Sequence, residues 1–159
     1  MAMTMTGEVM LPADQQTVWE KLNDPEVLKR CIPGCDTLEK VGDNELQASA
    51  KIAVGPVKAT FKGKVTLTDI DPPNGYRITG EGQGGVAGFA KGGAVVRLEP
   101  AEDGQTKMTY DVEASVGGKL AQLGGRLING VAKKYADNFF DAFAKEVQGN
   151  GVAGETSAA

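Results

Sequence analysis

The sequence of 159 residues contains no histidine, and this absence restricts the chemistry more than any residue that is present. Without histidine, the chain cannot form a Ser-His-Asp or a Cys-His nucleophile system. The only two cysteines, Cys31 and Cys35, fall short of the four ligands that a structural zinc ion takes. We therefore expect no metal site and no catalytic residue of these kinds.

Other features are scarce or missing, and each removes a class of protein. No run of about 18 apolar residues occurs, so the sequence predicts no transmembrane helix. Lysine and arginine number 17 against 21 aspartate and glutamate, and this net charge of −4 argues against a nucleic-acid-binding protein. Residues 1–12 lack both a basic start and a continuous apolar segment, so we expect no signal peptide and a cytoplasmic location.

What the sequence does contain is a series of segments in which apolar and polar residues alternate, as in strands with one buried face. The clearest runs from Val57 to Thr68, where lysines and threonines occupy every second position. Proline, glycine, asparagine and aspartate separate the segments and predict turns. The expected strands cover residues 4–11, 37–41, 46–54, 57–68, 76–81, 86–99 and 107–116.

Three segments have helical periodicity instead. Asp14 and Asp24 are expected to cap two short helices that follow the first strand, with Pro25 at the first position of the second helix. From Lys119 to about Gln148 the apolar residues recur every three to four positions, which predicts one helix of about 30 residues. Residues 149–159 are expected to form a disordered tail.

This order of elements predicts a single α+β domain over residues 1–148. Antiparallel strands that share an apolar face curl, and the long C-terminal helix is available to cover the concave side. The chain has 22 glycines, which are costly in a flat sheet and fit one that bends or leaves space inside. Small residues at inward positions, such as Ala48, Gly63 and Gly80, favour a cavity for an apolar ligand over a filled core.

The two cysteines are separated by Ile-Pro-Gly, a spacing that differs from the CxxC of thioredoxin-like redox sites. Proline and glycine between Cys31 and Cys35 favour a helix stop flanked by two structural thiols. A redox or metal site and a partner-docking loop are the alternatives.

Four stretches of the chain carry a resemblance to one family. They are CIPGC at 31–35, GPVKATFKGKVTL at 55–67, YRITGEGQGGVAGFAKGGAVVRL at 76–98 and VGGKLAQLGGRLINGVAKKYADNFF at 116–140. Together they resemble the carbon monoxide dehydrogenase CoxG family, within the SRPBCC superfamily of START-like and Bet v 1-like proteins, over residues 4–147.

The resemblance implies a helix-grip fold, in which a curved seven-stranded antiparallel sheet wraps around the C-terminal helix and encloses a hydrophobic cavity. It also implies an accessory, non-catalytic protein that serves a CO-dehydrogenase-type molybdenum hydroxylase in maturation, membrane recruitment or the handling of a lipid quinone. The bound molecule would be a quinone or lipid, with no covalent cofactor. That role would place the protein at the inner face of the membrane for part of the time.

Apolar residues of the strands and of the long helix are the candidates for the cavity wall, with a filled core as the alternative for each. The pattern leaves open which face carries the residues after the Gly82–Gly85 break, so Phe89 belongs either to the wall or to the surface. The candidates are Ile52, Val54, Phe61, Val65, Tyr76, Ile78, Phe89, Val95, Met108, Tyr110, Val112, Leu120, Leu123, Leu127, Val131 and Tyr135.

Cationic and acidic residues offer two further hypotheses. Lys119, Arg126 and Lys133 recur every seven residues with Lys134 beside them, as either a solvated helix face or a contact for lipid headgroups or an acidic protein. Glu81 is the candidate for a general base, on the condition that a bulge turns it into the cavity.

Three functions remain open from the sequence. The first is a carrier that holds a quinone or lipid tail between sheet and helix. The second is a polyketide-cyclase-like enzyme on the same fold, which needs a polar catalytic group inside the cavity. The third is a ligand-free maturation or docking factor with a filled core and an exposed apolar patch.

Overall fold

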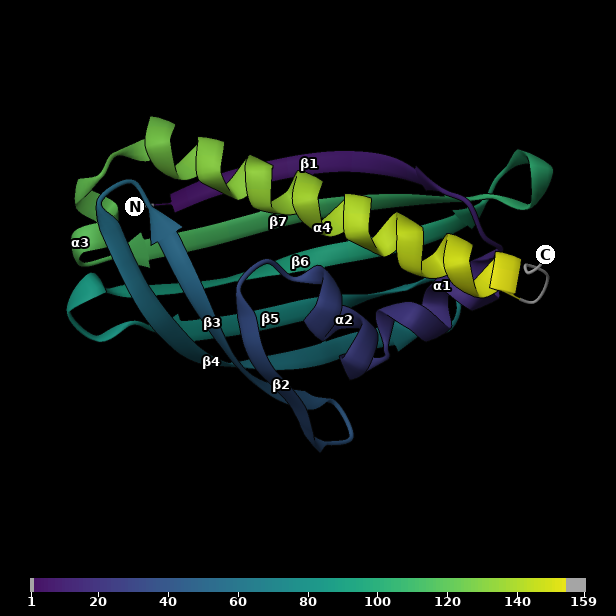
Figure 1. Cartoon of the computed structure of the whole chain (residues 1–159), viewed down its shortest axis with the longest axis horizontal. Coiled ribbons are helices and arrows are strands. Elements are labelled where there is room, and N and C mark those ends of the chain that lie inside the picture. Colours follow the sequence, from purple (N-terminus) through teal and green to yellow (C-terminus); the bar gives the residue numbers. More distant parts are fainter. Residues whose placement is uncertain (1, 154–159) are drawn as a thin grey trace.

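The computed structural model describes residues 2–153, and side chains for residues 2–148. Seven antiparallel strands form one sheet in the order β1-β7-β6-β5-β4-β3-β2, which confirms the predicted helix-grip architecture. Figure 1 shows helix α4 lying along the sheet, with α1 and α2 near its C-terminal half. The strands are β1 (Ala2–Leu11), β2 (Cys35–Gly42), β3 (Glu45–Val54), β4 (Val57–Asp71), β5 (Gly75–Gln83), β6 (Phe89–Pro100) and β7 (Thr106–Gly117).

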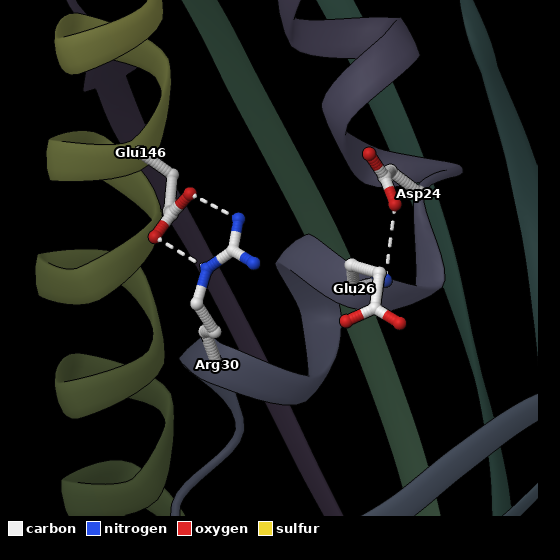
Figure 2. A network of polar contacts seen from close by, with 4 residues as sticks. All are labelled: Asp24, Glu26, Arg30 and Glu146. Atoms are coloured by element: carbon white, nitrogen blue, oxygen red, sulfur yellow. Dashed lines mark hydrogen bonds and ion pairs between the residues drawn. The ribbon is translucent and has the colours of Figure 1, made fainter.

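The two short helices begin where the sequence predicts. Asp14 caps α1 (Gln15–Leu22), because its carboxylate accepts hydrogen bonds from the backbone N–H of Thr17, at 3.4 Å, and from the Thr17 hydroxyl, at 2.5 Å. Asp24 caps α2 (Pro25–Cys31) through the backbone N–H of Glu26, at 3.0 Å (Figure 2). Short 3-10 turns, η1 (Gly85–Ala87) and η2 (Glu102–Gly104), precede β6 and β7. The sixth strand therefore begins at Phe89 rather than at residue 86.

The C-terminal helix differs from the prediction at both ends. Instead of one helix there are two, α3 (Lys119–Gln122) and α4 (Gly125–Ala153). Gly124 between them has φ +88°, a left-handed conformation that ends a helix. The expected end at about Gln148 is also wrong, because α4 continues to Ala153 through the first residues of the predicted tail. A glycine inside a helix costs only about 1 kcal/mol, so the glycines there do not end it. Residues 154–159 of the predicted tail lie outside the described residues.

The curvature of the sheet depends on close approaches of neighbouring backbones. A Cβ atom on Gly63 of β4 would collide with the carbonyl oxygen of Glu81, and one on Gly92 of β6 would collide with that of Glu113. Both glycines are in register with inward-facing residues, so the next strand crosses the space that an inward side chain would occupy. Glycine is therefore required here for the bend itself.

Two hydrophobic clusters lie between the sheet and the helices. The first cluster joins α1, α2 and the C-terminal half of α4 to the sheet, and the second cluster joins α3 and the start of α4 to it. Residues of the first cluster include Leu11, Val18, Trp19, Leu22, Val27, Tyr76, Val96, Leu98, Met108, Phe143 and Val147. Residues of the second cluster are Val54, Phe61, Ala87, Val116, Leu120 and Ile128.

One ion pair holds α2 against α4. Figure 2 shows the guanidinium of Arg30 donating two hydrogen bonds to the carboxylate of Glu146, from Nε to Oε2 at 3.0 Å and from Nη2 to Oε1 at 2.8 Å. This hydrogen bonding lowers the pKa of Glu146 below its ordinary value. Because the pKa of Glu146 is lower in the folded chain than in the unfolded chain, its charge stabilises the fold at a pH above the unfolded-state pKa. This contribution is lost as the pH falls through the folded-state pKa.

We expect Glu146→Gln to lower the Tm at pH 7 by about 1–4 °C, since an exposed pair contributes little. The difference from wild type should shrink as pH falls below the usual glutamate pKa of 4.5 towards the lowered value. Thermal unfolding followed by circular dichroism between pH 3 and pH 7 measures it. Glu39→Gln is the control, because Glu39 forms no ion pair among the described residues. An equal loss at every pH would contradict the role of the charge.

Candidate ligand-binding site

A cavity of about 390 Å³ lies between the inner face of the sheet and helix α4. Its floor is formed by inward residues of five strands: Met5, Val65, Leu67, Ile78, Ala94, Val96, Met108, Tyr110 and Val112. Ala136, Phe139 and Phe140 of α4 form the opposite wall, and Leu28 and Ile32 close the side towards α2. The wall is almost entirely apolar, as in sites that bind small apolar molecules.

The burial of these wall residues shows that the space is open rather than packed. Val65, Ile78 and Val112 face inward, yet each is only half-buried, whereas Phe143 of the first cluster is fully buried. Side chains packed in a protein core leave few voids larger than a water molecule. A few polar residues also line the cavity: Asn23, Lys40, Asp43, Asn44 and Glu45.

A larger hollow of about 630 Å³ lies on the outer face of the sheet, but it is a poorer candidate. Thr4, Thr66, Thr79 and Glu81 line it, and half of its wall is polar. Such a surface is well solvated without a ligand, so the apolar cavity on the inner face gains more from being filled.

Six of the predicted wall residues line the cavity: Val65, Tyr76, Ile78, Met108, Tyr110 and Val112. Six others pack in or against the second cluster instead: Ile52, Val54, Phe61, Leu120, Leu123 and Val131. The filled-core alternative describes these six, because α3 and the first turns of α4 lie directly over that end of the sheet. The inner face is therefore divided into a packed end and a hollow end.

Four predictions for the wall are corrected by the register of the strands and the position of α4. Val95 pairs with Arg77 and Asp111, and Phe89 pairs with Gln83, so both lie on the outer face of the sheet. Leu127 is 39% exposed beside the β3–β4 turn, and the Tyr135 hydroxyl accepts a hydrogen bond from the backbone N–H of Ala53, at 3.4 Å. Residues 127 and 135 hold α4 against β3 and do not line the cavity.

Several other residues of the cavity wall were not predicted from the sequence. Leu28 and Ile32 follow the cap of α2, and their apolar face could only be assigned to the cavity once α2 was placed over β2. Phe139 and Phe140 lie on the apolar stripe of α4, and that stripe was the available signal. Ala94 faces the cavity, because its neighbour Val95 faces outward. The glycines before Ala94 made it impossible to assign these faces from the sequence.

Small residues continue the inner face from the cavity towards the second cluster. An apolar hollow of about 340 Å³ lies over this strip, which reaches from Val65 of the cavity to Phe61 of the second cluster. Ala48, Gly80, Gly82, Ala90 and Ala114 line it. The small inward residues that the sequence contains thus leave space here, as predicted. Gly63 and Gly92 have a different role, because each allows a neighbouring strand to approach closely where the sheet bends.

The two tyrosines of the cavity differ in their hydrogen bonding. Tyr76 donates to the carbonyl oxygen of Leu22, at 3.3 Å, and burial raises its pKa above the ordinary value. Tyr110 stacks on Phe140 with ring centroids 5.0 Å apart, and its hydroxyl has no hydrogen-bond partner among the described residues. The Tyr110 hydroxyl lies over Gly7 of β1, where a Cβ atom would collide with it.

The candidate general base, Glu81, points away from the cavity. Glu81 lies between Lys64 and Lys91 in the strand register and belongs to the outer face with Glu113. The bulge that would turn Glu81 inward is absent from the β4–β5 pairing around it. The proposed general base is therefore excluded from this cavity, although Asp43 and Glu45 are among the residues that line it.

The cysteines lie beside the cavity as free thiols. Cys31 is buried in the first cluster and Cys35 is half-buried. Burial raises the pKa of Cys31 to about 11 and also raises that of Cys35, so both are protonated at neutral pH. Reactivity requires the thiolate, so this environment favours structural thiols. Among residues 2–148, no three His, Cys, Asp or Glu side chains gather as metal ligands would.

The predicted cationic stripe is divided by the break at Gly124. Lys119 belongs to α3, whereas Arg126, Lys133 and Lys134 belong to α4. Lys133 forms an ion pair with Asp137, with Nζ and Oδ2 3.3 Å apart. Within the described part of the chain, no helix is both long and apolar enough to cross a membrane.

Comparison with known families identifies the chain. The family model for CoxG of carbon monoxide dehydrogenase matches residues 7–148. The chain belongs to the CoxG family. This CoxG-family chain shares 37% identity with a conserved protein from Geobacillus kaustophilus, whose structure matches with a TM-score of 0.87 over 92% of this chain and 95% of that one. No curated protein matches the sequence.

More distant structures share the fold of this CoxG protein. A START superfamily protein from Mycobacterium smegmatis matches with a TM-score of 0.70 and 14% identity over 91% of this chain and 97% of that one. The ZhuI aromatase/cyclase from Streptomyces sp. R1128 matches with a TM-score of 0.67 and 14% identity over 94% and 95%. The family and the fold are those of a scaffold suited to hydrophobic ligands.

Proposed function

We propose that this CoxG protein is an accessory protein that binds one lipid or quinone molecule in the cavity. It would serve a CO-dehydrogenase-type molybdenum hydroxylase, by recruiting the enzyme to the membrane or by passing electrons to the bound quinone. The observation that carries the proposal is a hollow inner face with a largely apolar wall, in which Val65, Ile78 and Val112 are only half-buried. Burying apolar area supplies about 25 cal/mol per Å², less the cost of ordering the ligand.

The position of Tyr110 supports a quinone in particular. Its hydroxyl has no hydrogen-bond partner among the described residues, so it would donate one hydrogen bond to a ligand carbonyl while the stacked Phe140 contacts the ring. The same hydroxyl is what favours the second candidate, a cyclase-like enzyme, because it is a polar group of the wall that could act on a substrate. One acid without a base beside it is a weak catalytic set, so we place binding first.

Quinone binding can be measured through the single tryptophan of the chain. Trp19 packs on Tyr76 with ring centroids 5.2 Å apart, and Tyr76 lines the cavity, so a quinone in the cavity should quench Trp19 fluorescence. Titration with a short-chain ubiquinone or menaquinone analogue in lipid-free buffer gives the Kd. Native mass spectrometry of the protein from its own host, followed by organic extraction, identifies the natural ligand.

Ala94→Phe tests whether the cavity is the binding site. Ala94 lies on the cavity floor, so a phenyl ring there should fill the space and weaken quinone binding at least tenfold. Val95→Phe is the matched control, since the neighbouring residue lies on the outer face and should leave the Kd unchanged. Equal affinity in both variants would exclude this cavity. A wild-type protein that binds neither quinone nor fatty acid would favour a ligand-free docking factor.

A further inference from the structure

Three connections meet at one end of the molecule. They are the β3–β4 turn (54–57), the β5–β6 loop (83–89) and the β7–α4 segment (117–127), which together we call the docking end. Figure 1 shows them at the end opposite the one where α4 finishes. The backbone of Gly88 contacts Gly118, and Leu127 lies beside Gly55, so the three form one surface. The second cluster lies directly beneath, through Val54, Ala87 and Leu120.

The docking end exposes three large apolar side chains, of which Phe89 also packs over Gly117 and Leu127 beside Gly55. Val86 is 85% exposed at the tip of its loop, whereas its neighbour Ala87 is buried in the second cluster. Phe89, at the end of the same loop, is 37% exposed, and Leu127 on the neighbouring β7–α4 segment is 39% exposed. A large apolar residue as exposed as Val86 contributes little to the monomer, and exposed apolar side chains gathered on one surface are typical of interaction sites.

Charge separates the docking end from the rest of the chain. Residues 46–68, 82–98 and 114–136, which run through it, contain no aspartate or glutamate, although the whole chain carries 21. Lys119 and Arg126 are exposed on it and Lys58 is exposed directly beside it, and none of them forms an ion pair among the described residues. A chain of net charge −4 thus presents one purely basic surface, whose complement is anionic.

We infer that the docking end binds the surface of an anionic lipid bilayer, with Val86, Phe89 and Leu127 entering the headgroup region and Lys58, Lys119 and Arg126 contacting phosphates. Apolar tips flanked by cations are the combination that holds proteins at anionic membranes. A bilayer fits better than an acidic protein, because the apolar side chains come from a 3-10 turn, the start of a strand and a helix rather than from one flat face. A fluid surface adapts to such a shape.

This inference deepens the proposed function and rests on it for its purpose. The hollow strip of small residues leads from the cavity to Phe61, and Phe61 lies beneath Gly84 of the docking end, where a Cβ would come within 2.6 Å of its ring. The packed second cluster, to which Phe61 belongs, lies between the docking end and this strip. The docking itself does not require that the cavity be filled.

Co-sedimentation with vesicles tests the docking end. The wild-type chain should bind vesicles of about 30% phosphatidylglycerol in phosphatidylcholine, and bind at least tenfold more weakly to pure phosphatidylcholine or in about 500 mM salt. Val86→Asp and the double variant Lys119→Glu/Arg126→Glu should each reduce binding at least fivefold. All three residues are exposed, and circular dichroism should show an unchanged Tm.

Matched controls lie at the opposite end of the sheet. Met10 is 51% exposed and pairs with Lys107 there, so Met10→Asp and Lys107→Glu should leave vesicle binding unchanged. Equal binding by wild type, Val86→Asp and the double charge variant would overturn the inference, and so would binding to polyglutamate without binding to vesicles. Because quinone binding is measured in lipid-free buffer, loss of docking with retained quinone binding would reject the docking end and leave the proposed function standing.

Discussion

Phe143→Ala is expected to lower the free energy of unfolding by about 3–5 kcal/mol, the range for a phenylalanine deleted from a packed core. Phe143 of α4 is fully buried, and its ring stacks on that of Phe139 with centroids 5.6 Å apart. Its loss would leave a void where α4 meets α1 and the sheet in the first cluster. At about 2–4 °C per kcal/mol the Tm should fall by about 6–20 °C, as measured by calorimetry.

Phe140→Ala provides the comparison for this result. Phe140 lies three residues earlier on the same helix and is only half-buried, because it faces the cavity. Removing a side chain that borders an existing hollow loses less packing, so its effect should be clearly smaller than that of Phe143→Ala. A loss below about 1 kcal/mol for Phe143→Ala would mean that the C-terminal half of α4 is not packed as described.

Gly92→Ala should be the second severe substitution, with a loss of about 3 kcal/mol or more, at or beyond the upper end of ordinary overpacking. The added Cβ would collide with the carbonyl oxygen of Glu113 and would lie 2.8 Å from the Cα of Ala114, so a strand backbone would have to move. Gly63→Ala should behave alike, through the carbonyl of Glu81. Urea denaturation measures both losses.

Gly82→Ala is the matched control on the neighbouring strand. Its Cβ would meet the carbonyl oxygen of Lys62 at 3.8 Å and the Cβ of Phe61 at 3.9 Å, which are ordinary contacts. Alanine allows the unfolded chain fewer conformations than glycine does, so this variant should be more stable than the wild type by about 0.4–1 kcal/mol. If Gly82→Ala and Gly92→Ala destabilise the fold equally, the sheet does not bend at Gly92 in the way that the structure indicates.

Local patterns in the sequence determined the elements of this protein. Alternation within 57–68 predicted a strand with one wet face, and Asp14 and Asp24 predicted the starts of two helices, because such signals depend on neighbours only a few residues apart. The family resemblance added the strand number and the helix-grip arrangement, which the structure and the family match both support. The absence of histidine restricted the chemistry without any structure.

Only the tertiary structure decided where the hollow lies. Phe61 and Val65 share one face of β4, yet α3 and the start of α4 cover the first while a cavity opens over the second. Periodicity assigns a residue to a face but carries no information on which helix lies above it. Likewise, whether an inward glycine leaves space, as Gly80 does, or admits a neighbouring backbone, as Gly92 does, depends on how strands far apart in sequence approach one another.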